Sequence, residues 1–152
     1  MKITKKGEYG LRAVLALAAV YEESQTLNLR QIAKLERIPH KFLEQIMILL
    51  RKADLVISTK GKAGGYSLSR PPEKITIGEA IRSIEGPLAP LDTAAEIKRR
   101  IQTDDRHPGF YCVLLDVRNA VAEILDKKTL AEVCEKSQQI TGSKSPYEMY
   151  YI

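Results

Sequence analysis

The sequence predicts a mainly α-helical protein with one small β-hairpin, in which a compact amino-terminal unit precedes a long helix. Three observations lead to this fold class. Two short helical segments with a tight break between them occupy residues 29–53. Two β-prone runs around a glycine-rich turn occupy residues 55–69. Apolar side chains at helical spacing extend over residues 111–127.

The amino-terminal helices follow one another closely. Apolar residues recur at helical spacing over residues 6–23, which predicts an amphipathic first helix. Asn28, a residue type that caps helix starts, precedes a second helix expected over residues 29–36. Pro39 favours the first position of a third helix, which is expected to run to about Ala53.

The break between the second and third helices falls at Arg37 and Ile38. We expect Ile38 to fill the turn from inside. Arg37 stands where glycine or asparagine is comfortable, so a left-handed backbone there costs about 1 kcal/mol. The helix positions expected to face the interior are apolar: Ile32, Ala33, Leu43, Ile46 and Leu50.

The two expected strands are residues 55–59 and residues 66–69, with a turn over residues 60–65. Two helices across a tight turn, followed by a basic hairpin, make up a winged helix-turn-helix. We therefore assign residues 1–85 to this domain. A glycine-rich loop can also cradle a nucleotide phosphate, but this turn lacks the spacing and the following helix of a P-loop.

The second half is predicted to be helical around one irregular loop. Thr76 with Glu79 forms a capping box for a helix over residues 77–85. Residues 87–110 are the least regular part, with a possible helix over residues 93–101.

A long helix over residues 111–127 carries an apolar seam. Four of its apolar side chains step by three and four residues, as in a coiled-coil seam: Leu114, Val117, Val121 and Ile124. A second capping box at Thr129 starts a short helix to about Gln138. We assign residues 86–139 to this loop and its dimerisation helices, and residues 140–152 to a carboxy-terminal tail.

The net charge of +5 is unevenly distributed. Residues 1–74 hold 14 lysines and arginines against 7 acidic residues, whereas residues 75–152 hold 10 against 12. A basic first half fits a phosphate-binding module. No stretch approaches the roughly 20 apolar residues of a membrane span. Two cysteines are too few for a disulfide scaffold, so the expected location is the reducing cytoplasm.

The exposed face of the third helix is expected to be polar and carries His40, Lys41, Glu44, Gln45, Arg51 and Lys52. Glutamine bonds adenine with two hydrogen bonds, and glutamate accepts one from cytosine. Lys60 and Lys62 flank a glycine-rich tip that can approach the sugar–phosphate backbone or enter a minor groove. The alternative is a merely solvated face. The adjoining hairpin favours binding of double-stranded DNA.

Several of these segments together resemble the Rrf2 family of bacterial transcription regulators: residues 1–10, 42–45, 50–56, 61–68, 77–81 and 85–87. The resemblance implies a homodimer held by the long helix on a palindromic operator. By position it implies DNA contacts at Lys41, Phe42, Glu44 and Gln45 in the helix, and at Lys60 and Gly61 in the hairpin. Pro39 and Lys41 replace small hydroxyl residues common in the family, so the operator sequence is expected to differ.

Many members of this family, including iron–sulfur cluster regulators and nitric-oxide-sensing repressors, hold a cluster on three cysteines before the long helix. Here residues 87–110 contain no cysteine, and one thiolate cannot hold a cluster. We therefore expect no iron–sulfur cluster. An atypical redox or metal site on Cys112, His107 and Glu8 stays open, as does a lone redox-active Cys112. The alternative is that Cys112 is a small apolar residue on a buried helix.

Within the family, residues 85–90, 117–126 and 149–152 most resemble the cluster-free cysteine-metabolism repressors. That class works with O-acetylserine sulfhydrylase. The resemblance suggests that Tyr150, Tyr151 and Ile152 insert into this partner enzyme, although the tail can equally pack on its own dimer. The chain itself is not expected to be an enzyme, because it has no nucleophile elbow and no metal-ligand run. A regulatory subunit of O-acetylserine sulfhydrylase is the alternative function.

Overall fold

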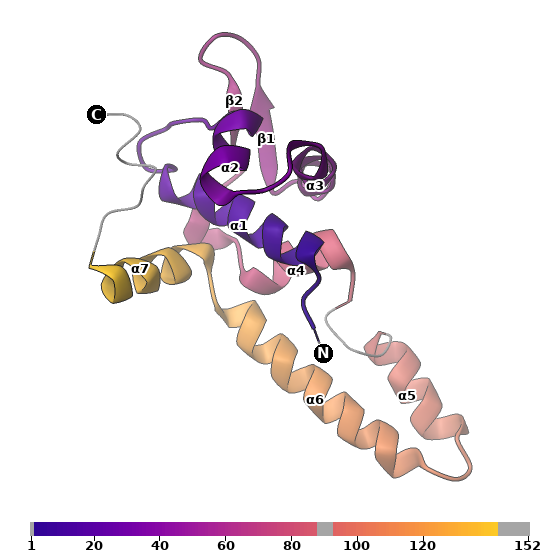
Figure 1. Ribbon diagram of the computed structural model, residues 1–152. Coiled ribbons are helices and arrows are strands. Elements are labelled where there is room, and N and C mark those ends of the chain that lie inside the picture. The colour runs from indigo at the N-terminus through magenta and orange to yellow at the C-terminus, as the bar shows by residue number, and fades with distance from the viewer. Residues whose placement is uncertain (1, 88–92, 143–152) are drawn as a thin grey trace.

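The computed structural model describes residues 2–87 and 93–142. The helices are α1 (Lys5–Ala19), α2 (Leu29–Glu36), α3 (His40–Lys52), α4 (Ile77–Glu85), α5 (Ala94–Thr103), α6 (Pro108–Lys127) and α7 (Leu130–Thr141). The antiparallel strands β1 (Val56–Thr59) and β2 (Gly65–Leu68) form a hairpin, and a short 3₁₀ turn spans Pro72–Lys74. The predicted fold class, mainly helical with a winged helix-turn-helix and a long helix, is confirmed (Figure 1).

Helix starts follow their capping side chains. The Asn28 side chain accepts a hydrogen bond from the Gln31 amide at 2.9 Å. The Gln31 side-chain oxygen in turn accepts one from the Asn28 amide, also at 2.9 Å. Thr129 and Glu132 form the same reciprocal box at α7, as predicted. At α4 only half of the predicted box forms. Thr76 accepts from the Glu79 amide, while the Glu79 carboxylate pairs with Arg70.

Some helix ends differ from the predicted ones. The first helix ends at Ala19 rather than at residue 23, because the chain turns back at a left-handed Ser24 (φ 52°). This turn places Leu27 in the core, with no exposed surface. The long helix begins at Pro108, three residues earlier than predicted, because proline suits a first helical position. The last helix runs on to Thr141 and ends at a left-handed Gly142.

The core lies between α1, α3 and the base of the hairpin. Its fully buried side chains include the predicted Ile32, Leu43, Ile46 and Leu50, together with Leu17 and Leu55. Ile38 is buried in the turn as expected, and Ala33 is half-buried against the core. Leu130, the first residue of α7, is also fully buried in this cluster. The carboxy-terminal helix thus packs on the amino-terminal body.

Arg37 adopts the left-handed conformation that the turn position requires, with φ 55° and ψ 46°. The amide of the next residue, Ile38, then donates to the carbonyl of Ala33 at 2.9 Å and closes α2.

Replacing Arg37 by glycine is expected to raise the free energy of unfolding by about 1 kcal/mol, since glycine adopts this conformation without a steric cost. Urea denaturation measures the difference. The same change at exposed Lys34, inside α2, is the matched control and should lower stability by about 1 kcal/mol. Equal effects at both positions would contradict a strained Arg37.

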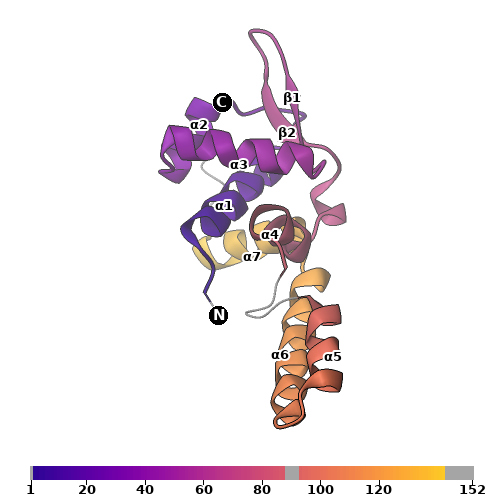
Figure 2. The same cartoon turned by 90° about the vertical axis from the view of Figure 1, so that its right-hand side faces the viewer.

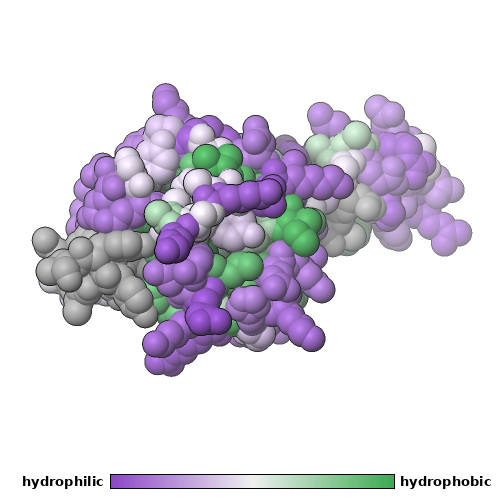
Figure 3. Space-filling model, turned by 90° about the horizontal axis from the view of Figure 1, so that it is seen from above, coloured by the Kyte–Doolittle hydropathy of each residue, from purple (hydrophilic) through white to green (hydrophobic). Residues whose placement is uncertain are grey.

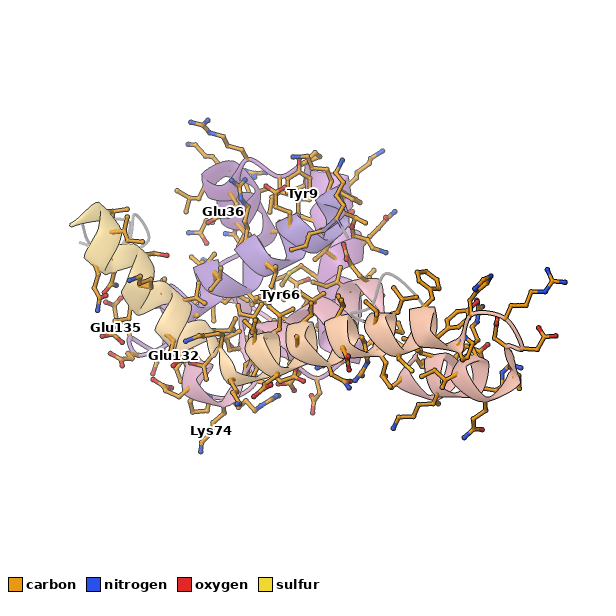
Figure 4. The ribbon with its side chains drawn as sticks, turned by 90° about the horizontal axis from the view of Figure 1, so that it is seen from below. Tyr9, Glu36, Tyr66, Lys74, Glu132 and Glu135 are labelled. Carbon is orange, nitrogen blue, oxygen red and sulfur yellow. The ribbon has the colours of Figure 1, made fainter. Side chains whose placement is uncertain are left out.

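α5 and α6 form an antiparallel arm that projects from the body (Figure 2). Ile97 of α5 is buried at 2% exposure, and the Arg100 guanidinium lies 5.8 Å from the centre of the Tyr111 ring of α6. Seen from below, α6 runs from α7, which bears Glu132 and Glu135, out to the tip of the arm (Figure 4). Within residues 2–87 and 93–142, no helix is long and apolar enough to cross a membrane.

The arm is tied to the body at its base. The Arg82 guanidinium of α4 donates to both carboxylate oxygens of Asp126 in α6, at 2.6 and 2.8 Å. The Ile77 amide donates a hydrogen bond to the backbone carbonyl of Lys128 at 2.8 Å, and the Leu130 amide donates one to the carbonyl of Ile75 at 2.9 Å. Side-chain and backbone bonds therefore fix the angle at which the arm leaves the body.

Hydrogen bonds from Arg82 lower the pKa of the Asp126 carboxyl below its usual value. Because this pKa is depressed in the folded state, the pair stabilises the fold above about pH 4 and stops doing so as the pH falls through the folded pKa. The Asp126 side chain is 44% exposed, so solvent screening limits the gain to about 1 kcal/mol.

Asp126→Asn is expected to lower the free energy of unfolding by up to about 1 kcal/mol at pH 7, and the difference from the wild type should shrink as the pH falls below about 4. Urea denaturation at pH 7, 5 and 3 tests this, with exposed Asp116→Asn on the same helix as the control. A deficit that persists unchanged at pH 3 would exclude the ionised pair as its cause.

Candidate nucleic-acid interface

α3 is held rigidly on the body. Leu43, Ile46, Met47 and Leu50 are at most 1% exposed along its inner side. Near its start, the half-buried Phe42 packs edge-on against Tyr9 of α1, with ring centroids 5.6 Å apart (Tyr9 is labelled in Figure 4). Phe42 therefore helps to anchor the helix, and its predicted contact with DNA stays a prediction.

The opposite face of α3 is open to solvent. His40, Lys41, Glu44 and Gln45 are all exposed on it, as predicted. His40 Nδ1 lies 3.4 Å from Glu44 Oε1, one turn along the helix. Figure 3 looks onto the wing, α2 and α3 and shows mostly hydrophilic side chains with apolar surface between them. Side chains of this kind on a rigid helix suit contact with base edges in a major groove.

The wing is the β-hairpin. Its first strand begins one residue later than predicted, and its second strand begins and ends one residue earlier. Its register pairs Val56 with Leu68 and Thr59 with Gly65. Lys60, Gly61 and Lys62 are exposed at its tip, where Gly61 takes a positive φ of 112°. The tip thus presents two lysines and bare backbone, as backbone contact with DNA requires.

The wing is docked on the body through the start of β2 and the turn before it. Leu27 and Tyr66 exchange backbone hydrogen bonds of 2.8 and 3.0 Å, and the Thr26 hydroxyl donates to Ala63 at 2.9 Å. A Cβ atom at Gly65 would lie 2.8 Å from the Leu27 backbone, so the close approach requires glycine. The wing and α3 therefore keep a fixed relative position.

A hollow of about 500 Å³ lies where α2, α3 and the wing meet. Its lining comprises Asn28, Leu29, Arg30, His40, Gly64, Gly65 and Tyr66. Sequence reasoning did not single out Arg30 or Tyr66. A signal for Arg30 exists, because a cation in the first turn of a helix opposes the helix dipole unless an anion binds there. A DNA phosphate is such an anion.

The residues proposed for an atypical metal site do not come together. Glu8 lies on α1 beside Lys5 and Arg12, at 3.4 and 3.8 Å, whereas His107 and Cys112 belong to the arm. In the described parts of the chain, no group of three histidine, cysteine or acidic side chains is placed to hold a metal ion. The expectation that the chain holds no iron–sulfur cluster stays a prediction.

The two cysteines lie in different surroundings. Cys112 is exposed on α6, so the expectation that it is a small buried residue is wrong. Cys134 of α7 is half-buried with its thiol 3.8 Å from the Leu15 carbonyl, and burial raises its pKa. The tail residues Tyr150, Tyr151 and Ile152 lie outside the described residues.

Residues 3–136 match the Rrf2 family, described as iron-dependent transcriptional regulators. The chain belongs to the Rrf2 family. It is 36% identical to the HTH-type transcriptional regulator CymR of Bacillus subtilis over the whole of both chains. Its similarity to relatives named as HTH-type transcriptional regulators agrees with the exposed α3 face and the basic wing.

Solved structures of Rrf2 proteins are similar over most of the chain. The structure described as CymR, the global cysteine regulator of B. subtilis, superposes with a TM-score of 0.76 at 34% identity and covers 90% of this chain and 98% of its own. IscR of T. potens gives a TM-score of 0.73 at 31% identity, covering 99% and 97%. This Rrf2 chain is therefore a winged-helix transcription regulator.

Proposed function

We propose that this chain is a homodimeric repressor that binds a palindromic operator. The observation that carries the proposal is the rigid juxtaposition of the open α3 face with the basic wing tip. α3 supplies Lys41, Glu44 and Gln45 for base edges in the major groove. Lys60 and Lys62 then lie one element away, on a tip suited to the adjacent phosphates.

An exposed apolar stripe on α6 supports the dimer. Its members Phe110, Val113, Val117 and Ile124 are 57%, 60%, 44% and 61% exposed. Steps of three, four and seven residues place them along one line, as in a helix seam. Leu114 and Val121 of the predicted seam are half-buried, so the exposed stripe is offset from it. A second copy of α6 is the partner whose stripe matches by symmetry.

Full-length similarity to CymR favours genes of cysteine and sulfur metabolism as the regulated set. We propose no cluster-dependent regulation, because the described residues do not provide a ligand set.

An interaction of the tail with O-acetylserine sulfhydrylase stays a prediction. Deleting Ile152 should abolish binding to that enzyme, and unchanged binding would refute the interaction.

Fluorescence anisotropy of purified protein with duplexes from its own promoter region tests the proposal. We expect salt-sensitive binding to one palindromic segment, with half-sites bound weakly. O-acetylserine sulfhydrylase added to the titration shows whether the enzyme alters binding. An ultraviolet–visible spectrum of anaerobically prepared protein should show no absorbance band in the visible range. No preference for any promoter segment would overturn the proposal, and cluster absorbance would make the chain a redox or iron sensor.

A further inference from the structure

The recognition face of α3 contains one large apolar side chain. Ile48 is 63% exposed, although it lies in the middle of a helix whose other apolar residues are buried or half-buried. Single exposed apolar residues are common on protein surfaces, so exposure alone carries no meaning. The position of Ile48 is what is informative.

Ile48 shares one face with the side chains proposed to read bases. It follows Lys41, Glu44 and Gln45 by seven, four and three residues, and such spacing stacks side chains along one line of a helix. Homeodomain recognition helices reach base edges with the same spacing. The buried residues Leu43, Ile46 and Leu50 lie on the opposite side.

Neither folding nor helix formation accounts for Ile48. The side chain adds little to the core, because most of its surface faces solvent. Isoleucine is also a poorer helix former than alanine, lysine or glutamate, so helix propensity does not favour it here. Figure 3, which looks onto the wing, α2 and α3, shows apolar surface bordered mainly by hydrophilic side chains.

We infer that Ile48 reads the 5-methyl group of a thymine in the major groove. This inference rests on the proposed operator binding. The thymine methyl is the apolar group among the hydrogen-bonding atoms on the major-groove edges of base pairs, so an aliphatic side chain distinguishes it. Ile48 has no hydrogen-bonding group, and its branched carbon restricts its rotamers, which suits a fixed contact with a methyl group. The thymine lies in each half-site near the base pair that Gln45 contacts.

The test replaces thymine by deoxyuridine, which removes only the methyl group. The probe is the promoter duplex that the full-length protein binds, synthesised with uracil at one symmetric pair of positions at a time. Wild-type protein is expected to lose about fourfold in affinity per contacted methyl group, or roughly fifteenfold for both half-sites. Ile48→Ala should bind the thymine duplex as weakly as wild type binds the uracil duplex, and should not distinguish the two.

Ile140→Ala is the matched control, since Ile140 is 74% exposed on α7, away from this face. It should retain the full preference for thymine. Thermal unfolding should be the same for all three proteins, because both isoleucines are exposed. Wild-type indifference to uracil at every position would overturn the inference while leaving operator binding intact. A preference for thymine that survives in Ile48→Ala would also overturn it, and absence of any specific binding would overturn the proposed function with it.

Discussion

Replacing Lys60 and Lys62 by alanine is expected to weaken operator binding about a thousandfold at 0.15 M salt. Each lysine that neutralises a phosphate steepens the dependence of log affinity on log salt concentration by about 0.9. Four such lysines in a dimer contribute about 3.6 to this slope. Relative to about 1 M salt, where this contribution vanishes, a slope of about 3.6 corresponds to roughly a thousandfold in affinity at about 0.15 M salt. The slope should become shallower by that amount, as measured by anisotropy titrations from 0.05 to 0.3 M salt.

A charge-matched control separates contact at the wing from net charge. Lys98→Ala with Lys136→Ala removes two exposed lysines from α5 and α7 instead. This control should change affinity only severalfold, because distant charges are screened by salt. Equal losses in the two double variants would show that the wing makes no specific contact, and no loss in either would place DNA binding elsewhere.

Val117→Glu is expected to convert the proposed dimer to single chains at micromolar concentration. The substitution places an unpaired carboxylate at the centre of the exposed α6 stripe, where the proposed symmetric interface would bury it from both chains. Burying an uncompensated charge costs about 3–5 kcal/mol, so the dissociation constant should rise more than a hundredfold. Sedimentation velocity measures the change in mass, and binding should fall to that of a half-site.

Asn119→Glu places the same charge on the same helix, on exposed surface outside the stripe. It should leave the dimer intact. The folded structure of each chain should survive both changes, since both positions are exposed, and circular dichroism checks this. Two variants that dissociate equally would indicate that charge anywhere on α6 breaks the dimer, whereas two intact dimers would exclude the stripe as the interface.

Helix starts were predictable because a capping side chain acts within one turn of the backbone. Asn28 caps its helix as predicted, and Thr129 forms the predicted capping box. The end of α1 was not predictable in the same way. Its apolar pattern continues to Tyr21, but the chain bends earlier to bury Leu27 beneath the wing. That contact depends on residues far along the sequence.

The candidate site shows the same division. Helical periodicity alone predicted the exposed polar face of α3, because a helix repeats every 3.6 residues. The packing of Phe42 against Tyr9 was not predictable, since Tyr9 belongs to a helix distant in sequence. The hollow with Arg30 and Tyr66 forms only where α2 meets the wing. Periodicity and motifs carry no information about contacts between elements that are distant in sequence.

The arm of α5 and α6 is inserted between α4 and α7, which both pack on the body. The chain leaves the body after α4, runs out along α5 and back along α6, and re-enters the core at Leu130. Since both ends of the arm are anchored, its length is independent of the packing of the body. Adding or removing whole helical turns in the arm would therefore reset the distance between the two DNA-reading bodies of a dimer. In the proposed dimer, the arm would thus set the spacing of the two half-sites, while α3 and the wing would make the base and phosphate contacts.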